Sequence, residues 1–418
     1  MGDREHSVVE EHEALALRGS TSSRTSGTTE GVSKPRSRGR WFRDASSLGS
    51  STTVDATAVR DAIGAVQDPE LHLGLEDAGM VESVDVSRAG DVAVTIRLTT
   101  PSCPMKDSLG QAVSEAAASV DGVRRVEVSW SAMSESERMS LAARLRGGRE
   151  AGHPFGDGST TRIYAVASGK GGVGKSSVTA NLAAALAAQG KRVGILDADV
   201  WGYSIPLLYG VRRSPVAIKG LMLPVEAHGV SLMSVGFFVD DDEPVVWRGP
   251  MLHKAIEQFL ADVHWGELDV LLVDLPPGTG DVTMSLLELV PDAQLLCVTT
   301  PQPAAASVAR RVGRMALDAR MPFAGVIENM SALACDSCGE HTPVFGSGGG
   351  QSLADELGVP LLGQVPLDLA LRMAGDAGTP VVLDAPGSPS AAELARIAVD
   401  LPVVRRSLAG RMLPLSVV

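Results

Sequence analysis

Apolar residues beyond residue 160 gather in short continuous runs that are separated by stretches with helical spacing. Such runs predict strands buried on both faces, because a strand with one wet face would alternate apolar and polar residues. The predicted strands lie at 163–168, 192–199, 269–276, 293–300 and 323–330. The pattern therefore predicts an α/β fold over 161–418, with a doubly wound, mainly parallel sheet.

A smaller unit with a different pattern precedes this domain, over 54–130. A helical pattern at 59–66 is followed by the turn sequence DPEL and by two strands that meet near Gly90. A helix after Pro104 and a closing strand at 124–130 complete the unit. This order of elements predicts a small α+β domain.

Polar segments without a continuing apolar pattern flank the small unit. Residues 1–53 are rich in Ser, Thr, Gly and Arg and predict a disordered extension. The acidic residues Glu10, Glu11 and Glu13 argue against the alternative of a transit peptide. A translation start assigned too far upstream would give a polar extension of the same kind. Residues 131–160 combine a short basic helix with a Gly, Asp and Ser-rich stretch, which predicts a linker.

Composition narrows the class of protein. The chain has 418 residues, 44% of them hydrophobic and 21% charged, which fits a globular protein of two or three domains. The net charge of -13 argues against broad binding to a phosphate backbone. No stretch approaches the ~20 apolar residues that a membrane span needs, and the first residues are acidic and polar. We expect a cytoplasmic protein with no nucleic-acid or membrane partner.

The sequence GKGGVGKS follows the first predicted strand of the larger domain and matches the phosphate-binding pattern G-x-x-x-x-G-K-[ST]. A strand precedes it and a helical pattern follows, so backbone N–H groups and the helix dipole can surround a phosphate. We expect Lys175 to reach the β- and γ-phosphates and Ser176 to coordinate Mg²⁺. The expected nucleotide-binding residues are Ser168, Gly169, Lys170, Gly171, Gly172, Val173, Gly174, Lys175, Ser176 and Ser177.

Acidic residues follow two other predicted strands. Asp274 ends an apolar strand, where a Walker B carboxylate would hold the Mg²⁺ shell. Gly278 and Gly280 follow it and can present backbone amides to the γ-phosphate. Asp197 and Asp199 follow the strand before it, either as site carboxylates or, as the structural alternative, as helix caps and loop residues.

Cysteine usage indicates metal chemistry. Of four cysteines, Cys335 and Cys338 form a CxxC pair in a polar, Gly-rich loop. A [4Fe–4S] cluster or a structural zinc needs four ligands, and a two-fold axis would supply the missing pair from a second copy. His341 extends the pair to CxxCxxH and keeps zinc as an alternative. Cys297 lies in an apolar strand and is expected to pack there, whereas Cys103 fits either a reactive thiol or a packed residue.

Several sequence segments together resemble one family. SGKGGVGKSSVTANLA, VDLPPGTGD and IENMSALACDSCGEHTPVFGSGG, followed by LLGQVPLD and GTPVV, resemble the bacterial Mrp (ApbC-like) iron–sulfur carrier ATPases from about Arg162 to Leu383. The segment 68–130, with DPEL and TTPSCPM, resembles the small domain often fused ahead of it and also found alone in iron–sulfur assembly proteins. Tyr203 and Ala78 depart from the family, which usually has proline and leucine there.

The family resemblance implies ATP binding and slow ATP hydrolysis by a homodimer. Lys170 resembles the extra lysine of the deviant loop in the nitrogenase iron protein, MinD and the partition ATPases, which crosses to the partner's nucleotide. Lys170, Lys175 and Asp199 are then the catalytic residues, with Asp199 resembling the aspartate that positions the attacking water. Asn329 resembles the class's adenine-contacting asparagine.

The resemblance also implies a labile [4Fe–4S] cluster bridged by Cys335 and Cys338 of both chains, for transfer to apo iron–sulfur client proteins and exchange with assembly scaffolds. Two other functions are alternatives. A positioning ATPase of the MinD or partition type would need a basic amphipathic tail, whereas VVRRSLAGRMLPLSVV is short and broken by proline. A nucleotide switch stabilised by structural zinc is the second alternative.

Overall fold

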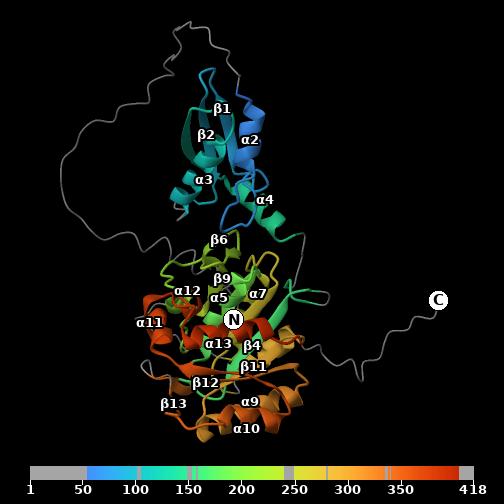
Figure 1. The fold of residues 1–418 in the computed structure, drawn as a ribbon. Coiled ribbons are helices and arrows are strands. Elements are labelled where there is room, and N and C mark those ends of the chain that lie inside the picture. The colour runs from blue at the N-terminus through green and yellow to red at the C-terminus, as the bar shows by residue number, and fades with distance from the viewer. Residues whose placement is uncertain are drawn as a thin grey trace, which may run out of the picture. The chain divides into compact units, whose positions relative to one another are not determined.

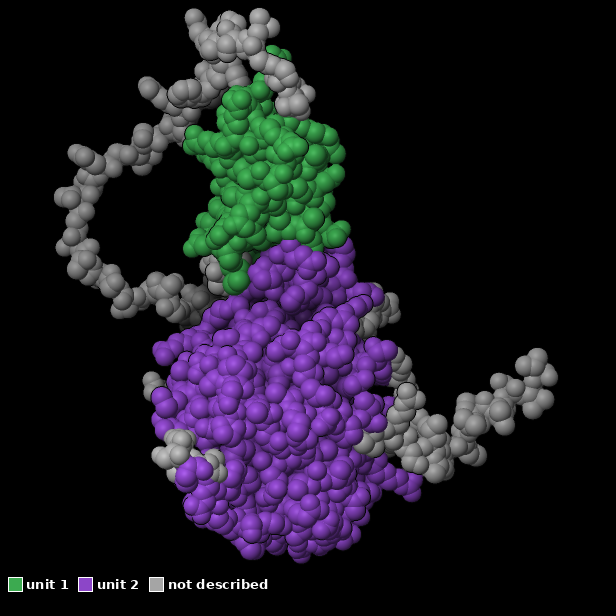
Figure 2. All heavy atoms as spheres, viewed as in Figure 1, with its two compact units in different colours: residues 1–66, 74–132 green, residues 67–73, 133–418 purple. Residues whose placement is uncertain are grey.

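The fold is taken from a computed structural model, which describes residues 54–100, 105–147, 153–156, 159–239, 249–278, 281–334, 338 and 340–403. These residues form two compact units, coloured separately in Figure 2. Unit 1 takes its described residues from 54–66 and 74–132, and unit 2 from 67–73 and 133–403.

Unit 1 consists of a three-stranded sheet and two helices, α2 (Ala56–Gly64) and α3 (Lys106–Ala118). Its strands are β1 (Val81–Val86), β2 (Asp91–Leu98) and β3 (Arg125–Ala132). β1 is antiparallel and β3 parallel to β2. Alternate residues of β2 are buried, and the apolar face of α3 is buried at helical spacing. The small α+β domain predicted from the sequence is confirmed.

Unit 2 is built on a large, mainly parallel sheet. The strands follow the order β13-β12-β11-β4-β10-β5-β9-β8, and β14 also pairs with β12. Only the pairs of β12 with β13 and of β8 with β9 are antiparallel in this sheet. The strands are β4 (Arg162–Ser168), β5 (Val193–Asp197), β8 (Val225–Ala227), β9 (Val230–Ser234), β10 (Val270–Asp274), β11 (Gln294–Thr299), β12 (Phe323–Ala334), β13 (His341–Thr342) and β14 (Leu361–Leu367).

Helices cover both faces of this sheet (Figure 1). One core packs α7 (Gly249–Ala261), α8 (Asp281–Leu289), α9 (Pro303–Asp318) and α10 (Gly349–Leu357) against the strands. The other core uses α5 (Lys175–Ala188), α6 (Ile205–Leu208), α11 (Leu369–Ala377), α12 (Val381–Asp384) and α13 (Pro389–Asp400). Successive residues of β4 alternate between the two cores, as two-sided burial requires. The predicted doubly wound fold is confirmed.

The remaining elements of unit 2 are short. They are α4 (Glu135–Leu145), the hairpin of β6 (Val216–Ile218) and β7 (Leu221–Leu223), and the 3-10 helix η1 (Val235–Phe238). A capping box formed by Ser134 and Glu137 fixes the start of α4. Among the described residues, no helix combines the length and the apolar content that crossing a bilayer requires.

The parallel pairing determines where the polar residues meet. β4, β10 and β5 are neighbours in the sheet and run in one direction. Their last residues, Ser168, Asp274 and Asp197, therefore lie at the same edge. In an open α/β sheet, ligands bind at this carboxyl edge.

Candidate functional site

The residues that the sequence indicated for nucleotide binding run from Ser168, the last residue of β4, through the loop 169–174 to Ser177 in the first turn of α5. Gly174 caps α5 with a left-handed backbone, φ 79°. A side chain at Gly174 would be strained by this conformation and would also meet the Nδ2 atom of Asn329 at 2.2 Å. The loop thus enters the helix in the geometry that directs backbone amides at an anion.

Position 169 requires glycine for a different reason, namely its close approach to α9. A Cβ atom built on Gly169 would lie 2.2 Å from the backbone nitrogen of Ala309 and 2.6 Å from the carbonyl carbon of Val308. These are backbone atoms of a helix and cannot move aside as a flexible side chain would. The start of the phosphate loop is therefore packed directly on α9.

Asp274 is the centre of a hydrogen-bond cluster beneath the loop. Its Oδ2 atom accepts bonds from the ammonium group of Lys175 at 2.7 Å and from the hydroxyl of Ser176 at 2.5 Å. Its Oδ1 atom accepts a bond from the hydroxyl of Thr179 at 2.8 Å. Asp274 is fully buried and Lys175 is 6% exposed, so their ion pair is shielded from water. The structure thus brings together the lysine, serine and aspartate that the sequence assigned to phosphate and Mg²⁺.

Asp197 and Asp199 add two more carboxylates to this edge. Asp199 lies 3.5 Å from the Lys175 ammonium group, and its Oδ1 atom is buried without a hydrogen-bond partner among the described residues. Asp197 is fully buried and accepts bonds from the Ser234 hydroxyl and from backbone N–H groups, including that of Asp199. Burial raises the pKa of both carboxyl groups, and the negative charge of Asp274 raises each further. The cluster therefore has three carboxyl groups beside the one ammonium group of Lys175.

The contacts of Asp197 fit the structural alternative that the sequence left open. Asp197 ends β5, and its side chain binds the backbone N–H groups of Asp199 and Ile205, the first residue of α6. It therefore has a structural role in shaping the loop that holds Asp199. The side chain of Asp199, in contrast, is directed at Lys175.

Lys170 lies at the mouth of the loop, and its ammonium group donates a hydrogen bond to Oε1 of Gln302 at 3.1 Å. Gln302 precedes α9 and belongs to the same chain. The Gly278 amide, which the sequence suggested for the γ-phosphate, instead donates to the Ser168 carbonyl at 2.8 Å. That expectation for Gly278 does not hold in this structure, and Gly280 lies outside the described residues.

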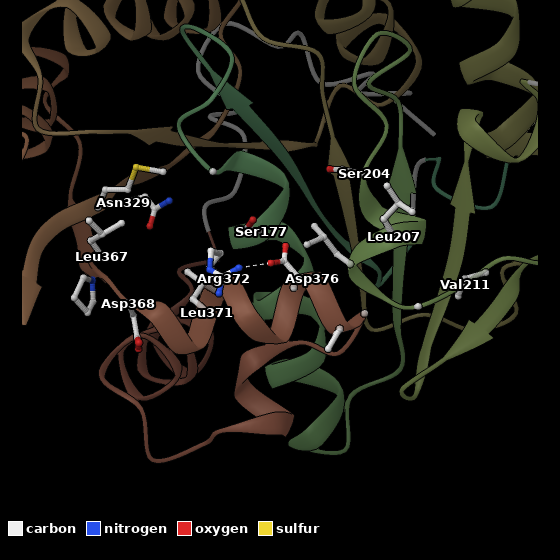
Figure 3. A pocket seen from close by; sticks show the side chains of 18 of the residues that line it. Ser177, Ser204, Leu207, Val211, Asn329, Leu367, Asp368, Leu371, Arg372 and Asp376 are labelled. Atoms are coloured by element: carbon white, nitrogen blue, oxygen red, sulfur yellow. Dashed lines mark hydrogen bonds and ion pairs between the residues drawn. The ribbon is translucent and has the colours of Figure 1, made fainter. Parts of the chain in front are cut away.

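A cavity of about 710 Å³ opens beside the phosphate loop (Figure 3). In this view Asn329 and Leu367 line it on the left and Leu207 on the right, with Ser177 and α11 between them. Asn329 is 2% exposed, and its Nδ2 atom donates to the Val173 carbonyl at 2.9 Å. Its Oδ1 atom has no partner among the described residues. A buried amide oxygen without a partner beside an apolar cavity suits an exocyclic amine of a base.

The carboxylate of Asp368 also lines this cavity, but it is already occupied by structural hydrogen bonds. It accepts the Ala370 N–H at the start of α11 and both the N–H and the hydroxyl of Ser390, which begins α13. Burial alone would raise the pKa of Asp368, but the hydrogen bonds from Ser390 and Ala370 outweigh it and lower the pKa. Asp368 therefore joins α11 to α13.

The cysteine pair follows β12, the strand that carries Asn329. β12 and β13 form an antiparallel hairpin, in which Leu333 pairs with Thr342 and Ala334 with His341. Cys338, between the two strands in sequence, is exposed, and Cys335 lies outside the described residues. Among the residues that the structure describes, no group of three or more His, Cys, Asp or Glu side chains could hold a metal ion within one chain.

The other predicted cysteine positions differ in what the structure says of them. Cys297 is fully buried in β11, and burial raises its pKa to about 12, so it is a packed thiol as the sequence suggested. Cys103 lies outside the described residues.

Tyr203, where the sequence departs from the family, has a local consequence. Its ring covers Gly236, where an added Cβ atom would meet Tyr203 Cδ2 at 2.3 Å.

Three residues of the site were not predicted from the sequence. Thr179 lies one turn into α5 and bonds Asp274, and its helical position four residues after Lys175 could have indicated this. Gln302 is distant in sequence from Lys170, so nothing local indicated the contact. Glu328 is 1% exposed and binds the Gly350 N–H in α10 at 2.5 Å, and its place in an apolar strand was the available signal.

Comparison with known families agrees with these features. The family described as NUBPL iron-transfer P-loop NTPase matches residues 159–401. The family described as iron–sulfur cluster assembly protein matches residues 56–130. The resemblance to iron–sulfur carrier ATPases and to the small assembly domain is therefore confirmed.

Individual relatives cover most of the chain. The iron–sulfur cluster carrier protein of Mycobacterium leprae (strain TN) is 50% identical over 368 residues, which are 86% of this chain and 96% of that protein. The protein of the same name from Mycobacterium tuberculosis (strain H37Rv) is 51% identical over 367 residues, again 86% and 96%. A solved nucleotide-binding protein from Archaeoglobus fulgidus, in complex with ADP, is 35% identical with a TM-score of 0.49, covering 59% of this chain and 94% of that one. The chain thus belongs to the family of iron-transfer P-loop NTPases, alongside the iron–sulfur cluster carrier proteins.

Proposed function

We propose that this protein binds and slowly hydrolyses ATP as a homodimer, and that it carries [4Fe–4S] clusters to apo iron–sulfur client proteins after receiving them from assembly scaffolds. The family match supports the carrier role in general terms. A MinD-like or partition-type positioning role is not favoured by that match.

One observation carries the proposal: β12 contains a residue of the proposed nucleotide site and leads directly to the cysteines of the proposed cluster site. Asn329 faces the cavity beside the phosphate loop, and the strand then continues to Ala334, directly before the cysteine hairpin. Nucleotide and cluster would therefore bind to opposite ends of one strand segment. A change at the nucleotide site has a direct covalent route to the cluster ligands.

ATP binding is assigned to the phosphate loop and the adjacent cavity. In this proposal, the Lys175 ammonium group moves from Asp274 to the β/γ-phosphate oxygens, and Asn329 contacts the adenine. Ser176 and Asp274 would hold Mg²⁺, which when bound neutralises charge on the phosphate oxygens.

Hydrolysis requires a positioned water and a second lysine. Asp199, whose buried Oδ1 atom has no partner among the described residues, would orient the water that attacks the γ-phosphorus. The bond between the γ-phosphorus and the β,γ-bridging oxygen breaks, and that oxygen leaves with ADP. Lys170 would reach the nucleotide of the partner subunit and stabilise the charge that develops there. The assignment of Lys170 requires a dimer at the moment of turnover.

Cluster binding is assigned to Cys335 and Cys338 of two subunits. Each hairpin offers two thiolates, whereas a [4Fe–4S] cluster needs four ligands. An isologous two-fold interface places the same loop of both subunits together and completes the set.

Metal analysis after anaerobic reconstitution tests the cluster assignment. We expect about four irons and four sulfides per dimer, and loss of both in Cys338→Ala, because that single change removes two of four ligands. Cys297→Ala is the control and should retain the cluster, because Cys297 is fully buried. Four irons on each monomer, zinc in place of iron, or full retention in Cys338→Ala would each contradict the assignment.

Steady-state phosphate release tests the ATPase assignment separately. Lys175→Ala should lower turnover at least 100-fold, because loss of one charge-stabilising contact of this kind costs about 3 kcal/mol or more. Lys191→Ala, at an exposed position after α5, is the control and should keep turnover within twofold. Wild-type turnover in Lys175→Ala would refute the assignment.

A further inference from the structure

The side chain of Lys170 has a defined partner on its own subunit. Its ammonium group lies 3.1 Å from Oε1 of Gln302, and the hydroxyl of Thr300 donates to the same oxygen at 3.2 Å. Lys170 and Gln302 are both half-buried. One amide oxygen thus receives two hydrogen bonds, one of them from a cation.

The side chain of Gln302 is free for this task because it does not cap its helix. Gln302 is the N-cap residue of α9, yet its side chain makes no capping hydrogen bond. Pro303 follows it and has no N–H group to be satisfied. The glutamine amide therefore has no role in starting α9, and its oxygen is directed at Lys170 instead.

The backbone of Lys170 lies in a closely packed loop, whereas its side chain could reach several positions. Gly169 packs against the backbone of α9, because a Cβ atom built on it would lie only 2.2 Å from the Ala309 nitrogen. The lysine stem is long and flexible, and its ammonium group can occupy several positions from one backbone site. The positive end of the α9 dipole lies nearby and disfavours a cation there. The bond to Gln302 therefore decides where the ammonium group rests.

We propose that Gln302 is a positioning residue that keeps Lys170 on its own subunit until ATP-dependent dimerisation draws the lysine to the partner's nucleotide. This inference rests on the proposed role of Lys170 in the homodimer. Breaking the hydrogen bond between Lys170 and Gln302 costs free energy each time that dimer forms. Gln302 thus weakens the ATP-bound dimer and limits cross-subunit contact when ATP is scarce.

The size of the effect follows from the type of bond. A half-shielded hydrogen bond from an ammonium group to a neutral amide favours one side-chain position by about fivefold. A symmetric dimer must release two lysines, so the dimer dissociation constant changes by about the square of this factor, roughly 25-fold. The constant measured with ADP should not change, because no γ-phosphate is present to attract Lys170.

Sedimentation equilibrium of the full chain with a non-hydrolysable ATP analogue measures this constant. Gln302→Ala should tighten the ATP-analogue dimer about 25-fold, and Gln302→Glu, which adds a negative charge beside Lys170, should weaken it at least fivefold. Gln351→Ala removes an exposed glutamine of α10 that bonds Asp355 and should leave the constant unchanged. In a Lys170→Ala background, Gln302→Ala should alter the dimer dissociation constant less than twofold, because no lysine remains to be released.

The double variant separates this inference from the function on which it rests. If Lys170→Ala dimerises and turns over ATP like the wild type, the role of Lys170 across the interface is wrong, and the role of Gln302 with it. If Lys170→Ala is impaired but Gln302→Ala matches the wild type, the function stands and the positioning role is refuted. An equal effect of Gln302→Ala with and without Lys170 would also overturn it, because the glutamine would then act through another group.

Discussion

Replacing Gly169 with alanine should destabilise the larger unit far more than the same change two residues later. The added methyl group would lie 2.2 to 2.7 Å from three backbone atoms of α9, at Val308 and Ala309. Neither partner is a flexible side-chain end, so the loop or the helix must shift. Overpacking of a well-packed site costs about 1–3 kcal/mol, and contact with backbone places this case near the upper value.

Gly171 provides the matched control within the same loop. A Cβ atom at Gly171 would meet nothing within 4 Å, and its φ angle is not positive. Gly171→Ala should therefore change the free energy of unfolding by less than about 0.5 kcal/mol. The two variants have the same composition and differ only in what surrounds the methyl group.

Thermal unfolding without nucleotide, followed by tryptophan fluorescence, tests the difference. Trp265 is 2% exposed in the core of the larger unit and reports its unfolding. For a unit of this size, about 3 kcal/mol corresponds to a midpoint about 6–12 °C lower for Gly169→Ala, with Gly171→Ala within about 2 °C of the wild type. Equal midpoints for the two variants would refute the close packing of the phosphate loop on α9.

Three further outcomes are expected. Asp368→Asn should lower the free energy of unfolding by about 1–2 kcal/mol at pH 7. Because the pKa of Asp368 is lowered in the folded protein, this stabilisation is present above the unfolded value near 3.8 and is lost as the pH falls through the folded pKa. Urea titrations of the two proteins should therefore converge at low pH. Glu328→Gln should lower the unfolding free energy by about 1–2 kcal/mol, because a buried carboxylate that binds the start of α10 loses its charge, whereas the exposed Glu340→Gln should be neutral in the same urea titration. Iodoacetamide at pH 8 should alkylate Cys338 in minutes but Cys297 only after unfolding, because burial raises the pKa of Cys297 to about 12; mass spectrometry of the digested protein checks this, and early labelling of Cys297 would contradict it.

Local sequence patterns predicted the parts of the site that lie on neighbouring residues. The phosphate loop was identifiable because strand, glycines, lysine and helix follow one another without interruption. Asp274 was identifiable because an apolar strand that ends in aspartate places it at the carboxyl edge. In both cases, the chemistry and the secondary structure are encoded within about ten residues.

Contacts between distant segments were not predictable in this way. The approach of α9 to Gly169 depends on how β4 and β11 lie side by side, which only the assembled sheet determines. The partner of Lys170 likewise lies after β11. The continuation of β12 beyond Met330 to Ala334 was also missed, because Met330 takes a left-handed backbone, φ 57°, within the strand, and no local sequence pattern predicts that conformation for a methionine.

The shortness of β13 has a consequence for how a cargo would leave. β13 contains two exposed residues, and its pairing with β12 consists of two opposed residue pairs. So small a ladder opens at little free-energy cost, and its amides should exchange hydrogen much faster than those in the central strands. In the proposed function, an edge that opens this easily would favour transfer of a cluster to an acceptor over its storage.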